Sequence, residues 1–114
     1  MKIFYGSSFM NKEELKEAGI NYPIKLEYYR TSEEEKETYT KSLSKYGIEV
    51  IKTEYLENKV NIENVEVKSI TSDEKEIDGI LEILKKYQVT PISAENIIED
   101  FQKKQFNTVI KLWG

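Results

Sequence analysis

From residue 46 to residue 70 the chain reads YGIEVIKTEYLENKVNIENVEVKSI, a pattern typical of two strands joined by a turn. The first part, residues 46–55, is rich in Ile, Val, Thr and Tyr, which are common in strands. Asn58 and Lys59 then mark a turn, and residues 60–70 again alternate apolar and polar side chains. The stretch therefore predicts an antiparallel hairpin.

A further strand is predicted upstream, at residues 24–28. Its sequence, IKLEY, alternates with period two, as a half-exposed strand does. Because these strands follow one another closely in the chain, an antiparallel meander is the simplest arrangement. Residues 31–37 are expected to form a charged loop, and a short strand at residues 38–43 would extend the sheet from three strands to four.

The first of two predicted helices covers residues 72–88. Its apolar side chains recur at the spacing of one helix face. These side chains are Ile77, Ile80, Leu81 and Leu84. Thr71 is expected to be the N-cap, with Glu74 completing a capping box. Gly79 costs this helix about 1 kcal/mol relative to Ala.

The second helix is predicted over residues 91–105. Pro91 suits the first helical position because it has no N–H to satisfy, and Thr90 is the preferred N-cap. Since only a short connector separates the two helices, they are expected to lie together as an αα-hairpin. The chain, residues 1–114, is thus predicted to be one α+β domain, with an antiparallel sheet of three to four strands packed with a C-terminal αα-hairpin.

Residues 1–23 leave two interpretations open. Asn11 could cap a short helix over residues 12–18, which the composition favours. Alternatively, the segment is a strand that runs into a turn at residues 19–21 and pairs with residues 24–30, which closeness along the chain favours.

The last residues, 107–114, form an apolar tail that ends near Trp113, the only Trp of the chain. A free Trp in water is unfavourable because this side chain buries about 150–250 Å² when it packs. The tail is expected to return to the sheet as an edge strand. The alternative is docking on a second copy or on a partner, where Trp is a favoured contact residue.

The composition excludes several classes of chemistry. The 114 residues include no Cys and no His, which removes disulfides, thiolate chemistry, imidazole bases and zinc sites with N or S ligands. No segment approaches the roughly 18 consecutive apolar residues of a membrane span, and the start lacks the apolar stretch of a secretory signal. We expect a cytoplasmic protein without membrane association, and we predict no catalytic residue, no cofactor and no metal site. The abundance of Ile, Lys, Asn and Tyr indicates an AT-rich, bacterial genome.

A small enzyme would have to use carboxylates or Tyr and Lys side chains. The run from Glu33 to Glu37 could bind Ca²⁺ or Mg²⁺, but it lacks the alternating oxygens around a glycine turn and favours a solvated loop. Glu27, Glu49 and Glu66 could be neighbours across the sheet and form an acid–base pair. Alternating glutamates on a solvent face explain them more simply. No small-molecule ligand can be identified.

The helix pair, residues 72–105, allows a different reading, a nucleic-acid-associated regulator. The recognition helix would present five polar side chains outward, which are Ser93, Glu95, Asn96, Glu99 and Asp100. Its acidic groups would repel phosphates, and the net charge of the chain is −4 with a single Arg. Nucleic acid is therefore not expected as a partner, and a structural hairpin that covers the sheet is favoured.

Tyrosines are the most informative candidates for a binding surface. Five of them fall in or beside the predicted sheet, namely Tyr28, Tyr29, Tyr39, Tyr46 and Tyr55. Exposed Tyr is enriched in interfaces, although cross-strand packing alone also makes Tyr common in strands. The candidate interaction residues are Tyr29, Arg30, Tyr55 and Trp113.

Four short strings resemble an uncharacterised family of short proteins from low-GC, spore-forming bacteria, a domain of unknown function. The strings are Tyr28-Tyr29-Arg30, Tyr46-Gly47-Ile48-Glu49-Val50, Val89-Thr90-Pro91-Ile92 and Ile97-Ile98-Glu99-Asp100-Phe101. The resemblance covers roughly residues 24–101, whereas the amino-terminal segment and the tail look atypical. Family members often have a His two residues after the Pro, where this chain has Ser93. The resemblance implies a cytoplasmic location and no known activity.

The sequence therefore favours a non-enzymatic protein-interaction or regulatory module in the cytoplasm. Its partner would be another protein or a second copy of the chain. The nucleic-acid-associated regulator is the alternative, and the small enzyme is a weaker one.

Overall fold

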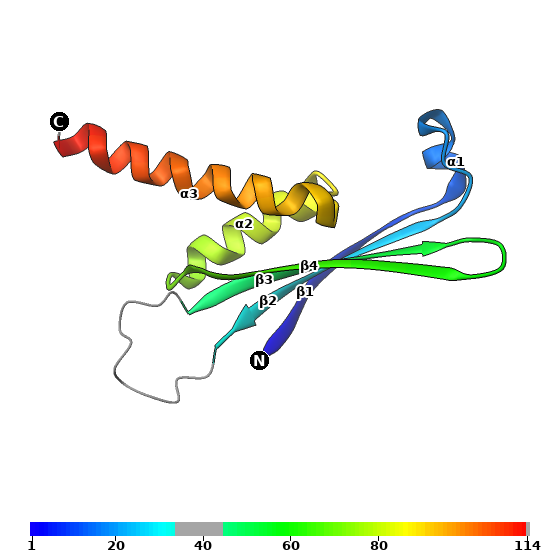
Figure 1. Ribbon diagram of the computed structural model, residues 1–114, viewed down its shortest axis with the longest axis horizontal. Helices are drawn as coiled ribbons and strands as arrows, with labels where there is room; N and C mark the ends of the chain where they lie inside the picture. Colours follow the sequence, from blue (N-terminus) through cyan, green and yellow to red (C-terminus); the bar gives the residue numbers. More distant parts are fainter. Residues whose placement is uncertain (34–44, 114) are drawn as a thin grey trace.

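A computed structural model describes the backbone of residues 1–33 and 45–113 and the side chains of residues 1–33 and 45–103 (Figure 1). The elements, in chain order, are β1 (Lys2–Met10), α1 (Lys12–Leu15), the 3₁₀ turn η1 (Lys16–Ala18), β2 (Ile24–Ser32), β3 (Tyr46–Tyr55), β4 (Val60–Thr71), α2 (Glu74–Lys86) and α3 (Pro91–Trp113). The predicted α+β class is confirmed.

The four strands form one antiparallel sheet in the order β1-β2-β3-β4, so the predicted meander is confirmed. Its fourth strand is β1, at the amino end of the chain. The prediction that the tail returns as an edge strand is wrong, because its backbone continues α3 as far as Trp113. The strand predicted at residues 38–43 lies outside the described residues.

The amino-terminal segment combines both of its predicted conformations. Residues Lys2–Met10 form an edge strand that pairs with β2, as the hairpin interpretation required. Asn11 then caps α1, because its Oδ1 accepts a hydrogen bond from the N–H of Glu14 at 2.9 Å. The helical stretch ends at Gly19, whose φ of 77° suits a residue without a Cβ.

Helix α2 lies across the sheet, and α3 packs beside it toward β4 (Figure 1). We call the face of the sheet beneath these helices the covered face. The core lies between these two layers, where apolar side chains of β2 and β3 meet those of the helices. Its fully buried large members are Leu26, Tyr28, Ile48, Val50, Ile77, Leu81, Leu84 and Ile98.

The beginning of α2 differs from the prediction. Asp73, not Thr71, is the N-cap, and its carboxylate accepts hydrogen bonds from the N–H groups of Lys75 and Glu76. Thr71 instead accepts a bond from the N–H of Asp73 through its hydroxyl, at 3.1 Å. A carboxylate at the positive end of the helix is the stronger cap because it also interacts with the helix dipole.

The connector between the helices is held to the sheet by one buried tyrosine. Gln88, with φ of 50°, follows the C-cap Tyr87 of α2, and Val89 then leads the chain into α3. The hydroxyl of Tyr28, on β2, donates to the backbone carbonyl of Val89 at 2.9 Å. Burial raises the pKa of Tyr28, since ionisation would place a charge inside the core. This bond fixes the helix pair to the centre of the sheet.

Helix α3 is longer than predicted. Pro91 is its first residue, as expected, and the carbonyl of Thr90 accepts from the N–H of Ala94 at 3.0 Å. The helix was expected to end at residue 105, but neither Pro nor Gly occurs between Ile92 and Trp113 to stop it. The αα-hairpin is thus present, with a second helix that continues through most of the tail.

Candidate functional site

The sheet has a second face, and no helix in the described part of the chain lies on it (Figure 1). Because side chains alternate along a strand, the cross-strand register assigns every second residue to this side. We call it the open face. Its side chains are Lys2, Phe4, Ser7 and Phe9 of β1, Lys25, Glu27, Tyr29 and Thr31 of β2, Glu49, Ile51, Thr53 and Tyr55 of β3, and Val60, Ile62, Asn64, Glu66 and Lys68 of β4.

Large apolar side chains remain exposed on the open face. Phe4 is 54% exposed and Phe9 59%, both on edge strand β1. Ile62, on edge strand β4, is 67% exposed, and Val60 and Tyr55 are exposed beside it. Single exposed apolar residues are ordinary, but five on one side of one sheet are typical of a surface that binds another molecule.

A polar network joins three strands at the centre of the open face. The Nζ of Lys2 lies 2.9 Å from Oε1 of Glu49, and the amide of Asn64 donates to Oε2 of the same carboxylate at 3.1 Å. The hydrogen bond to Glu49 raises the pKa of Lys2. This network connects β1, β3 and β4 and holds the lysine in place.

Tyr29 lies at the centre of an aromatic and cationic cluster on the same face. Phe4 meets its ring edge to face at a centroid distance of 5.5 Å, and the Nζ of Lys2 lies 4.5 Å from the ring centroid. Its hydroxyl donates to Glu27 at 2.8 Å, which raises the pKa of Tyr29. The ring is therefore ordered before any partner arrives, which reduces the entropy lost on binding.

The three glutamates that could form an acid–base pair all lie on the open face. Glu49 and Glu66 are register partners on β3 and β4, and Glu27 lies on β2. Each has a lysine neighbour, with Lys25 at 3.8 Å from Glu27 and Lys68 at 4.0 Å from Glu66. They lie on a strand surface with their charges balanced, which is the simpler of the two interpretations of the sequence.

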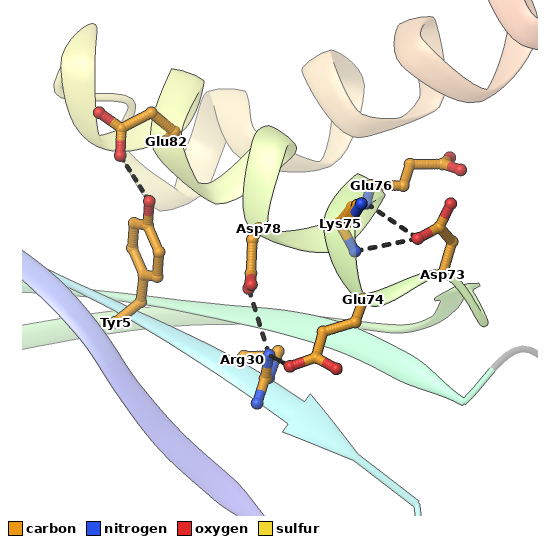
Figure 2. A network of polar contacts seen from close by, with 8 residues as sticks. All are labelled: Tyr5, Arg30, Asp73, Glu74, Lys75, Glu76, Asp78 and Glu82. Atoms are coloured by element: carbon orange, nitrogen blue, oxygen red, sulfur yellow. Dashed lines mark hydrogen bonds and ion pairs between the residues drawn. The ribbon is translucent and has the colours of Figure 1, made fainter.

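Arg30 lies on the covered face, opposite its sequence neighbour Tyr29 (Figure 2). Its Nη1 is 3.2 Å from Oε1 of Glu74 and 3.3 Å from Oδ1 of Asp78, both on α2. On the same side Tyr5 donates to Glu82 of α2, and this bond raises the pKa of Tyr5 to about 12. These contacts position α2 on the sheet.

The structure thus brings together two of the four candidate interaction residues. Tyr29 and Tyr55 share the open face, whereas Arg30 is on the other side. Trp113 is the last residue of α3, and its side chain lies outside the described residues, as do Tyr39 and most of the acidic run from Glu33.

The sequence interpretation missed the contribution of the edge strands to this surface. Phe4 and Phe9 were overlooked because β1 carries a register shift between Phe4 and Gly6, which breaks the alternation that marks a strand. Ile62 could have been found, because Val60 and Ile62 point to one side of an unbroken strand and Val65 and Val67 to the other.

Helices α2 and α3 present an acidic outer surface. Residues 73–103 contain eight acidic and four basic side chains. The five residues assigned to a DNA-reading face are exposed, namely Ser93, Glu95, Asn96, Glu99 and Asp100. Their negative charge makes this surface a poor match for a phosphate backbone.

Three further features of the described residues concern metal binding, small ligands and membranes. In residues 1–33 and 45–103, no three Asp or Glu side chains converge as a group that could bind a metal ion. A hollow of about 270 Å³ lies beside the ends of the strands, near Lys2, Ser32 and Lys45. None of the described helices has both the length and the apolar character that a membrane crossing needs.

Comparison with known proteins identifies a family. No curated protein and no solved structure matches the chain. A family model matches residues 7–104, which extends the resemblance expected over residues 24–101 into β1 and α1. The amino-terminal segment therefore belongs to the family pattern from residue 7 onward, contrary to expectation. The chain belongs to the family described as "Family of unknown function (DUF6514)".

Proposed function

We propose that the chain is a non-enzymatic protein-interaction module with a regulatory role, and that the open face of its sheet is the contact surface. The observation that carries the proposal is the set of exposed apolar side chains on that face, arranged around an ordered Tyr29. Protein interfaces are enriched in such aromatic residues, and their rims are polar. The open face has both features.

A protein partner fits this surface better than a small molecule or a nucleic acid. The hollow at one end of this face measures about 270 Å³, which is less than the roughly 300–1,000 Å³ of the clefts that enclose small ligands. The open face carries three lysines and three glutamates, which are Lys2, Lys25, Lys68, Glu27, Glu49 and Glu66. Such a neutral surface lacks the basic excess that phosphate binding requires.

The proposal includes a bacterial cytoplasm as the setting. The composition supports it, because a chain without Cys needs no oxidising compartment and its Ile, Lys, Asn and Tyr content is typical of an AT-rich genome.

The test is a comparison of two matched variants in affinity capture from native cells. In the first, Phe9→Ser with Ile62→Ser removes apolar area from the open face. In the second, Ile92→Ser with Tyr87→Ser removes exposed apolar area, 77% and 66% exposed respectively, from the helical layer. Circular dichroism checks that both variants fold. We expect the first variant to lose the proteins that the unmodified chain retains, and the second to keep them.

Equal retention by both variants would contradict the proposal. Retention of duplex DNA at micromolar concentration, with a steep dependence on salt, would favour the nucleic-acid-associated regulator instead.

A further inference from the structure

We propose that the partner of the open face is a second copy of the chain, stacked face to face so that two sheets form a sandwich. This inference rests on the proposed function and names the partner of the same surface. It follows from the distribution of charge, the position of the exposed apolar residues and the area of the face.

The two halves of the open face carry opposite net charges, so two copies of the face can be complementary. The half formed by β1 and β2 carries two lysines and one glutamate, which are Lys2, Lys25 and Glu27. The half formed by β3 and β4 carries two glutamates and one lysine, which are Glu49, Glu66 and Lys68. A twofold axis parallel to the strands, between β2 and β3, would place each half over the opposite half of the second copy. The mainly basic side of one sheet would then meet the mainly acidic side of the other, as an isologous interface requires.

The same axis pairs the two most exposed apolar side chains of the edge strands β1 and β4. Phe9, Lys25, Thr53 and Ile62 form one row across the four strands. Reversal of this row by the twofold axis brings Phe9 of one copy over Ile62 of the other, twice in each dimer. Both residues are more than half exposed in the single chain, at 59% and 67%. Stacking would remove both from water and leave them in an apolar environment.

The area of the open face is sufficient for a reversible dimer. Strands β1 and β2 are 9 residues long. Four strands of this length cover about 19 Å by 30 Å at the usual strand spacing and rise. Two such faces would together bury roughly 1,100 Å², which exceeds the approximately 1,000 Å² of a specific contact and lies just below the approximately 1,200 Å² at which stable interfaces begin. We therefore expect dissociation constants in the micromolar range.

The helical layer is a poorer surface for a second copy. Between residues 73 and 103 the acidic side chains outnumber the basic ones by eight to four. Two such surfaces would repel each other, whereas the open face is neutral. The orientation of a dimer is therefore set by charge as well as by apolar area.

The absence of Cys in the natural chain makes a direct test available, because any introduced thiol is unique. Phe9→Cys and Ile62→Cys are prepared separately, mixed, and treated with a short bismaleimide whose reach matches the ~10 Å between packed sheets. We expect the mixture to give a cross-linked dimer that becomes weaker on dilution. Phe9→Cys alone should react poorly with itself, since its two thiols would lie on opposite edges of the dimer. Ile92→Cys, on the helical layer, is the control for random collision.

Sedimentation equilibrium supplies a second measurement that does not depend on the thiols. The unmodified chain should associate at micromolar concentrations, Phe9→Asp should not, and Ile92→Asp should associate as the unmodified chain does. The inference would be overturned if the unmodified chain stayed monomeric even at about a hundred times micromolar concentration. It would also be overturned if Ile92→Cys cross-linked as strongly as the mixture of Phe9→Cys and Ile62→Cys. If the chain is monomeric but the Phe9→Ser, Ile62→Ser variant still loses a different protein, the second copy is wrong and the proposed function stands. If that variant loses neither partner nor self-association, both proposals fail.

Discussion

The covered and open faces of the sheet are made from alternate residues of the same strands, and they differ in their exposure to water. On β2, Leu26 and Tyr28 are fully buried beneath the helices, while Glu27 and Tyr29, which alternate with them, are partly exposed and contact each other. The buried hydroxyl of Tyr28 has a partner in Val89, and in residues 1–33 and 45–103 no buried side-chain N or O atom lacks one. Beneath the helices, side chains of the covered face are buried and their buried polar atoms have hydrogen-bond partners, whereas the open face keeps apolar surface exposed to water.

We therefore expect the covered face to determine the stability of the fold and the open face to determine association. A buried aliphatic side chain contributes through the area it removes from water and through its packing. The ion pairs of the open face, such as Lys2 with Glu49, are solvated and contribute little to the free energy of unfolding. Substitutions on the open face should therefore change association while the free energy of unfolding changes little.

The largest effect is expected at the centre of the core. Leu81→Ala should lower the free energy of unfolding by about 2–5 kcal/mol, because this side chain of α2 is fully buried and the substitution leaves a cavity. Ile62→Ala on the open face removes a side chain of similar size and should cost less than about 1 kcal/mol. Urea denaturation followed by circular dichroism measures both. Equal losses would show that the open face is part of the core.

A smaller effect is expected for a single hydroxyl group. Tyr28→Phe should lower the free energy of unfolding by about 1–3 kcal/mol, because the buried carbonyl of Val89 then loses the hydroxyl that donates to it. Tyr29→Phe, the same change on the open face, should stay within about 1 kcal/mol, since water can replace the hydroxyl at Glu27. A larger loss at Tyr29 than at Tyr28 in urea denaturation would reverse the roles of the two faces.

The two faces should also respond to alkaline pH through their tyrosines. The folded pKa values of Tyr5 and Tyr28 lie above the unfolded value near 10, so the stability they provide is complete below pH 10 and is lost as the pH rises through the folded values. The raised pKa of Tyr22, which donates to Glu54, adds to this loss. Stability should be nearly constant from pH 6 to 8, where no side chain of this chain has its ordinary pKa.

Melting temperatures between pH 6 and 11 test this dependence. We expect a decline that begins near pH 10 and is shallower in Tyr5→Phe and in Tyr28→Phe. A steep change between pH 6 and 8 would instead indicate a carboxylate or Lys with a strongly shifted pKa, and thus a site of different chemistry.

The smallest effect is a gain in stability that leaves the open face untouched. Gly79→Ala in α2 should raise the free energy of unfolding by about 1 kcal/mol, because a Cβ there would meet no atom within 4 Å and Ala favours the helix. Gly47→Ala on β3 is the contrasting variant, since its Cβ would lie 2.5 Å from the carbonyl oxygen of Val67 and must destabilise the sheet. Association by Gly79→Ala should equal that of the unmodified chain, and a change would link the helix to the open face.

Much of this architecture could be predicted from local pattern. The strands β2, β3 and β4 were found because β-branched residues alternate with polar ones, and α2 because four apolar residues repeat at helical spacing. Strand β1 was left as one of two alternatives, because a bulge near Tyr5 and the run Gly6-Ser7-Ser8 interrupt its alternation. The end of α3 was misplaced because an apolar tail can satisfy the pattern of a strand or of a helix, and only the absence of a stop signal favours the helix.

The candidate site was predicted in part. Tyr29 and Tyr55 were candidates because Tyr in or beside a sheet is often exposed and exposed Tyr is enriched in interfaces. Arg30 was grouped with Tyr29 although adjacent residues of a strand point to opposite sides, so parity alone could have separated them. Tertiary packing decides which face of the sheet the helices cover, and no local sequence pattern predicts it.

The central claim is that the open face, and not the helical layer, contacts the partner. Hydroxyl-radical footprinting of the unmodified chain tests it in three samples, which are dilute protein, concentrated protein, and dilute protein in an extract of native cells. We expect oxidation of Phe4 and Phe9 to fall in the concentrated sample if the partner is a second copy, or in the extract if it is another protein, while that of Tyr87, exposed at the end of α2, stays the same. Protection of Tyr87 with unchanged oxidation of Phe4 and Phe9 would contradict the account.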